Sequence, residues 1–300
     1  MDRIISLIRY RFFLFAGIFP YLLGQAIAFS FNKSLGQRAM VCPPMAKAIN
    51  WHYFWLGFLG ISLVLIGVEL FNEYFDAKEG GDRIFLKESP GIPDYFFSLG
   101  IFVFILAFFI GLYLAFKTGW PVLLFSFLGF LGAYFYVGPP IKWAYRGWGE
   151  LVIAFSYGPL MILGSFYLQT KRINSLPFFA FSLCGLALFC LALLNEIPDY
   201  YQDKLVGKKN LVVRLGKQKS LKLLGTGLTC LFTILAIGVV FKKIPLLSIV
   251  SFCFLPLMIK GLTRVYRNFD NPQKFLSAVN ACINIYLAVA VSLGIGYLRG

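Results

Sequence analysis

The stretch LALFCLALLNEIPDYYQDK, residues 186–204, decides how the chain is organised. Its apolar first half runs without a break into Asn195-Glu196-Ile197-Pro198-Asp199, and Asp203 follows four residues later. Carboxylates at this spacing lie on one face of a helix, so Asp199 and Asp203 are expected to point the same way. Pro198 is expected to end or bend the helix that precedes it.

A second copy of this opening lies upstream, as Asn72-Glu73-Tyr74-Phe75-Asp76. Both copies read Asn-Glu-x-x-Asp, and both follow an apolar segment of membrane-spanning length. The repeat suggests duplication of a helical unit. We therefore expect one domain over residues 1–300, with two motif-bearing halves at roughly 1–150 and 151–300.

The composition excludes an ordinary soluble domain. The 300 residues are 59% hydrophobic and only 14% charged, whereas about a quarter of a soluble domain is charged. Nine apolar segments approach the length that spans a bilayer as a helix, and none alternates as a barrel strand does. They cover approximately residues 12–31, 51–71, 95–116, 120–138, 151–168, 177–194, 223–241, 244–262 and 277–298. The sequence predicts an all-α membrane bundle of about nine helices around a central cavity.

The basic residues indicate how this bundle is oriented. The net charge is +15, and 19 of the 28 Lys and Arg residues fall on one side of the predicted helices. This bias predicts a cytoplasmic N-terminus, an external C-terminus and both acidic motifs on the cytoplasmic side of the cell inner membrane. Because the basic residues occupy short loops between apolar runs, we expect no nucleic-acid partner.

The acidic residues are concentrated in two places. Nine of the 13 lie in the loops that follow the second and sixth apolar segments. Carboxylates at the edge of hydrocarbon are costly, so such clusters commonly bind a cation. Mg²⁺ prefers hard oxygen ligands and often bridges carboxylates to substrate phosphates. A solvated loop of mixed charge is the alternative interpretation for any single acid.

These motifs resemble those of the UbiA-type intramembrane prenyltransferases. The first motif of that family is similar to residues 72–82, and the second is similar to residues 195–203 and their continuation to residue 216. Asp82 follows Asp76 by six residues, behind two glycines. This spacing is similar to the 1,4-dihydroxy-2-naphthoate polyprenyltransferases of menaquinone synthesis, and residues 136–150 and 164–170 resemble that branch too. Residues 84–94 depart from it, since they lack a basic and threonine-rich continuation.

The resemblance implies Mg²⁺-dependent transfer of a polyprenyl group from its diphosphate to an aromatic acceptor, within the lipid bilayer. Positive charge stabilises the departing diphosphate in such chemistry. The resemblance implies catalytic roles for Asn72, Asp76, Tyr136, Asn195 and Asp199. The implied metal ligands are Asp76, Asp82, Asp199 and Asp203. The implied diphosphate-binding residues are Lys78, Arg83, Lys142, Arg146, Lys204 and Lys208. The implied residues that stabilise the allylic cation or bind the acceptor are Tyr74, Tyr145 and Glu150, of which Glu150 is expected to orient either the acceptor or Arg146.

Two other functions remain open from the sequence. The same chemistry on 4-hydroxybenzoate, homogentisate or the glycerol phosphate of archaeal lipids is one. Transport of a cation or of phosphate is the other, because charges at interrupted membrane helices suit transport. A transporter is expected to carry charges near the midplane of several helices, whereas these helix interiors are almost uncharged apart from Glu69.

Overall fold

The structure is a computed structural model that describes residues 2–38, 48–79, 94–267 and 272–300. Within these ranges every regular element is a helix, so the all-α prediction is confirmed. The elements are α1 (Asp2–Arg38), α2 (Trp51–Glu79), α3 (Tyr95–Thr118), α4 (Pro121–Val137), η1 (Trp143–Arg146), α5 (Gly149–Phe155), η2 (Ser156–Leu160), α6 (Met161–Thr170), α7 (Phe178–Glu196), α8 (Tyr200–Leu205), α9 (Leu211–Leu215), α10 (Lys217–Val240), η3 (Leu246–Phe254), α11 (Leu255–Arg267) and α12 (Pro272–Arg299).

The long helices form a bundle that fits a membrane. In the described part of the chain, seven helices are long and apolar enough to cross a bilayer, and α4 is a shorter apolar helix. One of the seven is the continuous rod of α5, η2 and α6, in which η2 is a single π-helical turn. Large side chains on α3 face outward, with Phe116 88% exposed and Phe109 60% exposed, as expected for a lipid-facing surface. The number of nine spans stays a prediction.

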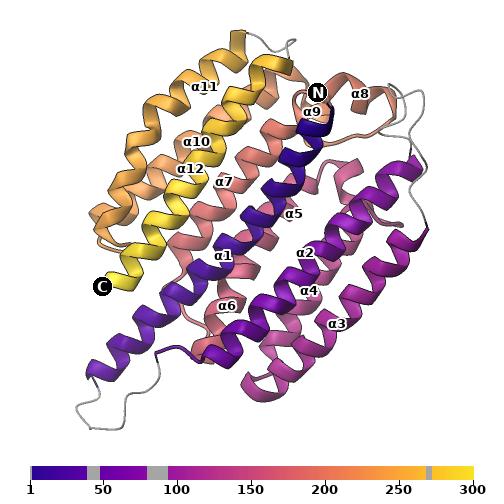
Figure 1. Cartoon of the computed structure of the whole chain (residues 1–300). Helices are drawn as coiled ribbons and strands as arrows, with labels where there is room; N and C mark the ends of the chain where they lie inside the picture. The colour runs from indigo at the N-terminus through magenta and orange to yellow at the C-terminus, as the bar shows by residue number, and fades with distance from the viewer. Residues whose placement is uncertain (1, 39–47, 80–93, 268–271) are drawn as a thin grey trace.

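Helix α7 lies at the centre of the bundle. In the apolar stretch of α7, 67% of the residues are buried, compared with 22% in the span formed by η3 and α11. Helix α7 packs against α5 and η2 on one side and against α10 and α12 on the other (Figure 1). Gly158 of η2 meets Gly185 of α7 so closely that an added Cβ would lie 2.8 Å from the Gly185 Cα. Small residues at such crossings let two membrane helices approach.

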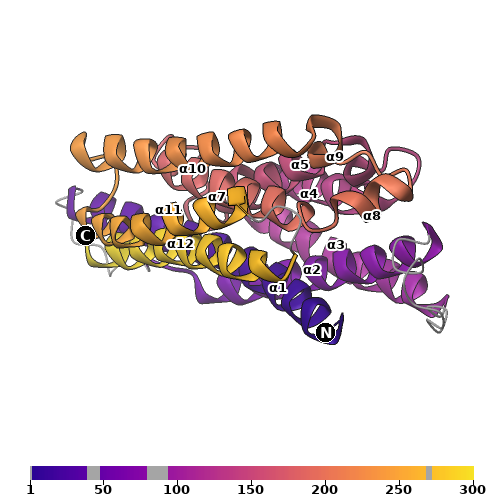
Figure 2. The ribbon, with the colours of Figure 1, turned by 90° about the horizontal axis from the view of Figure 1, so that it is seen from above.

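The two acidic motifs come to the same end of this bundle. The C-terminal end of α2 and the short helices α8 and α9 lie together at one end in both views (Figures 1 and 2). Helix α7 ends at Glu196, two residues before Pro198, so the predicted end of that helix is confirmed. The chain can therefore turn across the end of the bundle, and α8 starts directly after Asp199.

Candidate active site

A cavity of about 80 Å³ opens between α2, α4, α5, η2 and α6. Its wall is mostly Val, Leu, Ile, Met, Ala and Gly, with a few polar groups that include Asn72, Tyr136 and Tyr157. Asn72 and Tyr136 stand near the C-terminal ends of α2 and α4, whereas Val64 and Gly129 lie about two turns deeper on the same helices. An apolar cavity with a few polar groups is the usual form of a small-molecule site.

Asn72 presents an unsatisfied polar atom to this cavity. Its Oδ1 is buried and accepts no hydrogen bond from any residue that the structure describes. Leaving a buried acceptor without a donor costs free energy, so such an atom commonly serves a ligand. Asp76 lies one turn further along α2, but its side chain falls outside the described part, as do Asp82 and Arg83 entirely.

Tyr74 and Lys78 pair with each other on the last turns of α2. The Lys78 ammonium donates to the Tyr74 hydroxyl and lies 4.3 Å from the centre of its ring. It also lies 4.0 Å from a carboxylate oxygen of Asp94, while its own side chain is exposed. The structure thus places an accessible cation next to an aromatic ring at the end of the first motif.

The second motif folds as predicted, into a helical turn. The Asp203 amide donates to the Asp199 carbonyl at 2.8 Å, so the two residues are one turn apart. Asp199 is exposed at the start of α8, whereas Asp203 is only 7% exposed. Asn195 is half-buried in the last turn of α7. The motif therefore has one solvent-exposed carboxylate, that of Asp199, and one buried carboxylate, that of Asp203.

Asp203 belongs to a compact polar network. The side-chain amide of Asn210 donates to Glu196 Oε2 at 2.5 Å and to Asp203 Oδ2 at 2.6 Å. The Lys208 ammonium lies 3.2 Å from Glu196 Oε2 and 3.4 Å from Asp203 Oδ2. One lysine and one amide thus hold two carboxylates together.

Lys208 alone does not offset the effect of burial on Asp203. Burial raises the pKa of Asp203 above its ordinary value, and Glu196 raises it further, while Lys208 opposes both effects. A carboxylate in this position gains from additional positive charge. This end of the bundle is therefore suited to a bound cation.

Glu150 holds the segment that carries Asn210. Its Oε1 accepts a hydrogen bond from the Leu211 amide at 3.1 Å, across 61 residues of chain. Its Oε2 is buried without a hydrogen-bond partner among the described residues. Arg146, which we expected Glu150 to orient, donates to the Pro140 carbonyl at 3.1 Å. The contact of Glu150 with α9 was not predicted, and a role of Glu150 toward the acceptor stays a prediction.

Tyr145 of η1 lies against the segment that directly follows the second motif. The Tyr145 ring centre is 5.8 Å from the Lys142 ammonium and 5.9 Å from that of Lys208. The Tyr145 carbonyl also accepts from the Lys209 amide at 3.0 Å. The structure therefore brings together two cations that we predicted to bind diphosphate, and Lys204 is exposed on neighbouring α8.

Sequence reasoning missed two residues of this site. Asn210 caps α9 through its Oδ1, which accepts from the Val213 amide at 2.8 Å. An Asn directly before a short apolar helix is a typical capping signal, so the cap was detectable. The hydrogen bonds of Asn210 to Glu196 and Asp203 could not be predicted from the sequence. Tyr157 of η2 lines the cavity and gave no local signal at all.

The oxygen atoms available at this end of the bundle are of the kind that Mg²⁺ binds. Asp199, Asp203 and the unsatisfied Asn72 Oδ1 are all hard oxygen ligands. Among the described side chains, no three acidic, His or Cys groups converge on a single point. Asp76 and Asp82, which the prediction also requires, lie outside that set of side chains.

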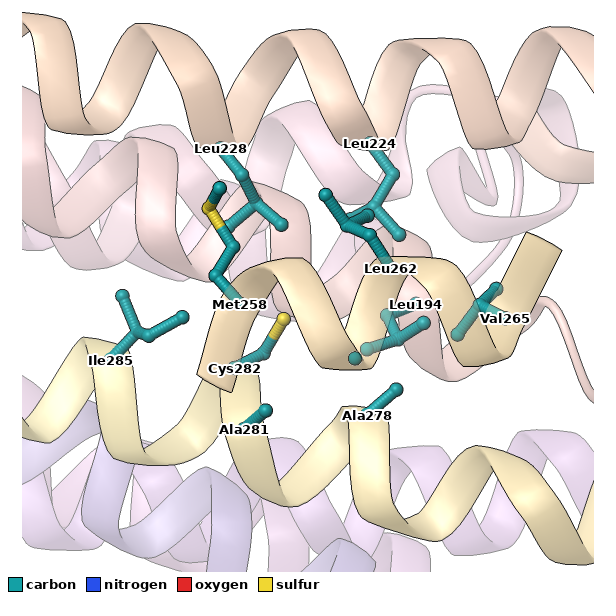
Figure 3. Close-up of a pocket in the computed structure, with 11 residues that line it drawn as sticks. Leu194, Leu224, Leu228, Met258, Leu262, Val265, Ala278, Ala281, Cys282 and Ile285 are labelled. Atoms are coloured by element: carbon teal, nitrogen blue, oxygen red, sulfur yellow. The ribbon is translucent and has the colours of Figure 1, made fainter. Parts of the chain in front are cut away.

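A second pocket lies away from this site, between α7, α10, α11 and α12 (Figure 3). Its lining is entirely apolar or sulfur-containing, for example Leu228, Met258 and Cys282. Its volume is about 10 Å³, which is no more than one water molecule needs. It is a packing defect of the bundle. The larger cavity, which Asn72 lines, remains the candidate site.

Comparisons with known proteins agree with this geometry. A family model described as the UbiA prenyltransferase family matches residues 44–287. The chain is 27% identical over 252 residues to the 1,4-dihydroxy-2-naphthoate octaprenyltransferase of Bacillus subtilis, covering 79% of each chain. It is 25% identical over 288 residues to the 2-carboxy-1,4-naphthoquinone phytyltransferase of Synechocystis, covering 93% of this chain and 88% of that one.

Solved structures share the fold. A structure described as digeranylgeranylglyceryl phosphate synthase aligns over 100% of both chains, with a TM-score of 0.68 and 16% identity. A UbiA homologue from Archaeoglobus fulgidus bound to DMAPP and Mg²⁺ aligns over 96% of this chain and 97% of that one, with a TM-score of 0.59 and 15% identity.

Proposed function

Because the chain belongs to the UbiA prenyltransferase family and is an integral membrane prenyltransferase, we propose that it transfers a polyprenyl group from polyprenyl diphosphate to 1,4-dihydroxy-2-naphthoate. Relatives in Bacillus subtilis and Synechocystis are named for naphthoate or naphthoquinone acceptors, which supports this choice over 4-hydroxybenzoate or homogentisate. One structural observation carries the proposal. Both motif-bearing helix ends meet at one end of the bundle, where an apolar cavity opens beneath Asn72.

The acidic residues would hold Mg²⁺ at this end. The proposed ligands are Asp76, Asp82, Asp199 and Asp203. When bound, the ion supplies positive charge that stabilises the oxygens of the leaving diphosphate. Lys78, Arg83, Lys142, Arg146, Lys204 and Lys208 are the proposed cations for the remaining phosphate oxygens. The ammonium groups of Lys142 and Lys208 both lie within 5.9 Å of the centre of one ring, that of Tyr145, which supports a shared phosphate site there.

The cavity would contain the reacting carbons. As the bond between the prenyl C1 and the diphosphate oxygen breaks, positive charge spreads over the allylic group and must be kept from water. Tyr136 and Tyr157 line the cavity, and aromatic rings attract such charge when it lies over their faces. The acceptor ring then attacks C1, and the attacked ring carbon loses its proton, or its carboxyl group as CO₂, so that the ring becomes aromatic again. The apolar wall around Val64 and Gly129 would hold the prenyl chain. Asn72 Oδ1 is available to accept a hydrogen bond within the same space.

We also propose the orientation that the charge bias predicts. The acidic end of the bundle faces the cytoplasm, the N-terminus is cytoplasmic and the C-terminus external, in the cell inner membrane. Nine membrane helices and two motif-bearing halves belong to this arrangement. Labelling of single cysteines introduced at Lys219 and Lys171 tests it, because only the residue on the outer face should react with an impermeant reagent in intact cells.

Reconstituted protein with a radiolabelled polyprenyl diphosphate and a panel of acceptors tests the function. We expect Mg²⁺-dependent product with the naphthoate acceptor, and none in EDTA. Asp76→Ala and Asp199→Ala should each lower turnover more than about 100-fold, because transition-state charge then lacks stabilisation. Lys219→Gln, a change at an exposed residue of α10, is the control.

Wild-type turnover in either aspartate variant would remove that residue from the site. Product with 4-hydroxybenzoate, homogentisate or a glycerol phosphate but not with the naphthoate would change the acceptor. Cation or phosphate flux into liposomes without pyrophosphate release would favour the transporter instead.

A further inference from the structure

We propose that Asn210 is a positioning residue that sets the metal affinity of the second motif by holding the Asp203 carboxylate in place. The proposal rests on the proposed function, since it concerns the cation that Asp199 and Asp203 would bind. Asn210 lies outside both Asn-Glu-x-x-Asp motifs and touches neither the cavity nor an exposed surface. Its effect on a metal must therefore pass through the carboxylates that it contacts.

The hydrogen bonds of Asn210 are fully used in one arrangement. The side chain is 1% exposed. Its Nδ2 donates to Glu196 Oε2 and Asp203 Oδ2, and its Oδ1 accepts from the Val213 amide. Because the two N–H groups of an amide have fixed directions, they also fix where the two acceptor oxygens lie. The orientation of the Asp203 carboxylate thus follows from the orientation of this amide.

Asn210 is itself anchored to the rigid part of the bundle. The next residue, Leu211, donates its amide to Glu150 Oε1 on α5, and the Lys209 amide donates to the Tyr145 carbonyl in η1. Helix α8, by contrast, has only six residues and packs mainly on α9. Asp203 therefore takes its position from the α5 side of the bundle through Asn210, more than from its own short helix.

This arrangement keeps two carboxyl groups together. Glu196 and Asp203 share the single ammonium of Lys208, and without further donors their carboxylates repel each other. The amide supplies one donor to each of them. Groups that orient a metal ligand in this way typically contribute a factor of 10 to 100 to metal affinity.

The test is Asn210→Ser, with Asn210→Thr as a second variant. Either hydroxyl can still accept from the Val213 amide and cap α9, but neither supplies two directed donors. Asn174→Ser is the matched control, because Asn174 also accepts a backbone amide, that of Leu176, in the loop between α6 and α7. Mn²⁺ binding without substrate, followed by electron paramagnetic resonance, measures the metal affinity directly. Thermal unfolding is measured in parallel.

We expect both Asn210 variants to bind Mn²⁺ at least about 10-fold more weakly than wild type. Their unfolding midpoint should fall only modestly, because the hydroxyl keeps the cap on α9. Turnover should return toward the wild-type kcat at high Mg²⁺, because the catalytic groups remain. Wild-type Mn²⁺ affinity in either variant overturns the proposal. A weaker affinity that comes with a large fall in the unfolding midpoint of both variants also overturns it, because Asn210 would then serve the fold alone.

Failure of the proposed function gives a different result. In that case the wild-type protein itself shows no Mn²⁺ binding that depends on Asp199, and no prenyl transfer. A wild-type protein that binds Mn²⁺ and transfers the prenyl group, beside an Asn210→Ser variant that does both equally well, removes only the inference about Asn210.

Discussion

Replacing Lys208 by methionine tests how much its ammonium group stabilises the fold through Glu196 and Asp203. Methionine keeps most of the unbranched stem and removes the ammonium that contacts Glu196 at 3.2 Å and Asp203 at 3.4 Å. The three side chains are 12%, 14% and 10% exposed, so water can replace little of the lost interaction. Both carboxylates are then left in an enclosed space with Asn210 as their remaining partner in the network.

The magnitude follows from the burial of the ion pair. Removing one partner of a buried pair costs about 3–5 kcal/mol. The lower end applies here, because burial already raises the pKa of Asp203 and protonation of that carboxyl relieves part of the repulsion. We therefore expect Lys208→Met to lower the free energy of unfolding by about 3 kcal/mol in EDTA.

Magnesium should restore much of this loss. A ligand present at a hundredfold excess over its Kd stabilises the folded state by about 2.7 kcal/mol. A divalent cation beside Glu196 and Asp203 replaces the missing positive charge, so the variant should gain more from Mg²⁺ than the wild type does. Unfolding in detergent is followed in EDTA and in Mg²⁺, with Lys204→Met as the exposed control, which should change stability by less than about 0.5 kcal/mol. Wild-type stability of Lys208→Met in EDTA, or equal stabilisation of both proteins by Mg²⁺, would refute the reasoning.

Two further predictions concern glycines of the bundle, one at the crossing of η2 and α7 and one in the cavity wall. Gly158→Ala should lower the free energy of unfolding by at least about 1–3 kcal/mol, because the new Cβ would lie 2.8 Å from backbone atoms of Phe181 and Gly185, which cannot move cheaply. Gly294→Ala in α12, where an added Cβ meets no atom of the described residues within 4 Å, is the control for thermal unfolding and should be neutral or stabilising. Gly129→Phe should lower kcat/KM for long polyprenyl diphosphates more than for dimethylallyl diphosphate, since Gly129 lines the cavity and its added Cβ has open space. An equal fall for both substrates would place the prenyl chain elsewhere.

The local structure was predictable from the sequence wherever one physical rule dominates. Backbone groups inside a bilayer must pair within their own segment, so the long apolar runs predicted helices, and the structure has helices there. A proline removes a backbone hydrogen bond and clashes with the preceding turn, so Pro198 predicted an end or a bend there, and α7 ends two residues earlier. The four-residue spacing of Asp199 and Asp203 predicted one helical turn, and the backbone bond between them confirms it. Each of these conclusions depends only on neighbours along the chain.

Contacts between distant residues were decided by tertiary structure alone. A membrane helix that is apolar all round carries no signal for which of its faces meets which neighbour, so the cavity of Asn72, Tyr136 and Tyr157 was not readable from the sequence. The same holds for Glu150. Its Oε1 accepts a hydrogen bond from α9 because α5 and α7 pack side by side. The sequence by itself determined which residues carry charge at the helix ends. The packing of the bundle decided which of those charges share one site, because their positions depend on helix rotations that lipid-facing apolar surfaces do not specify.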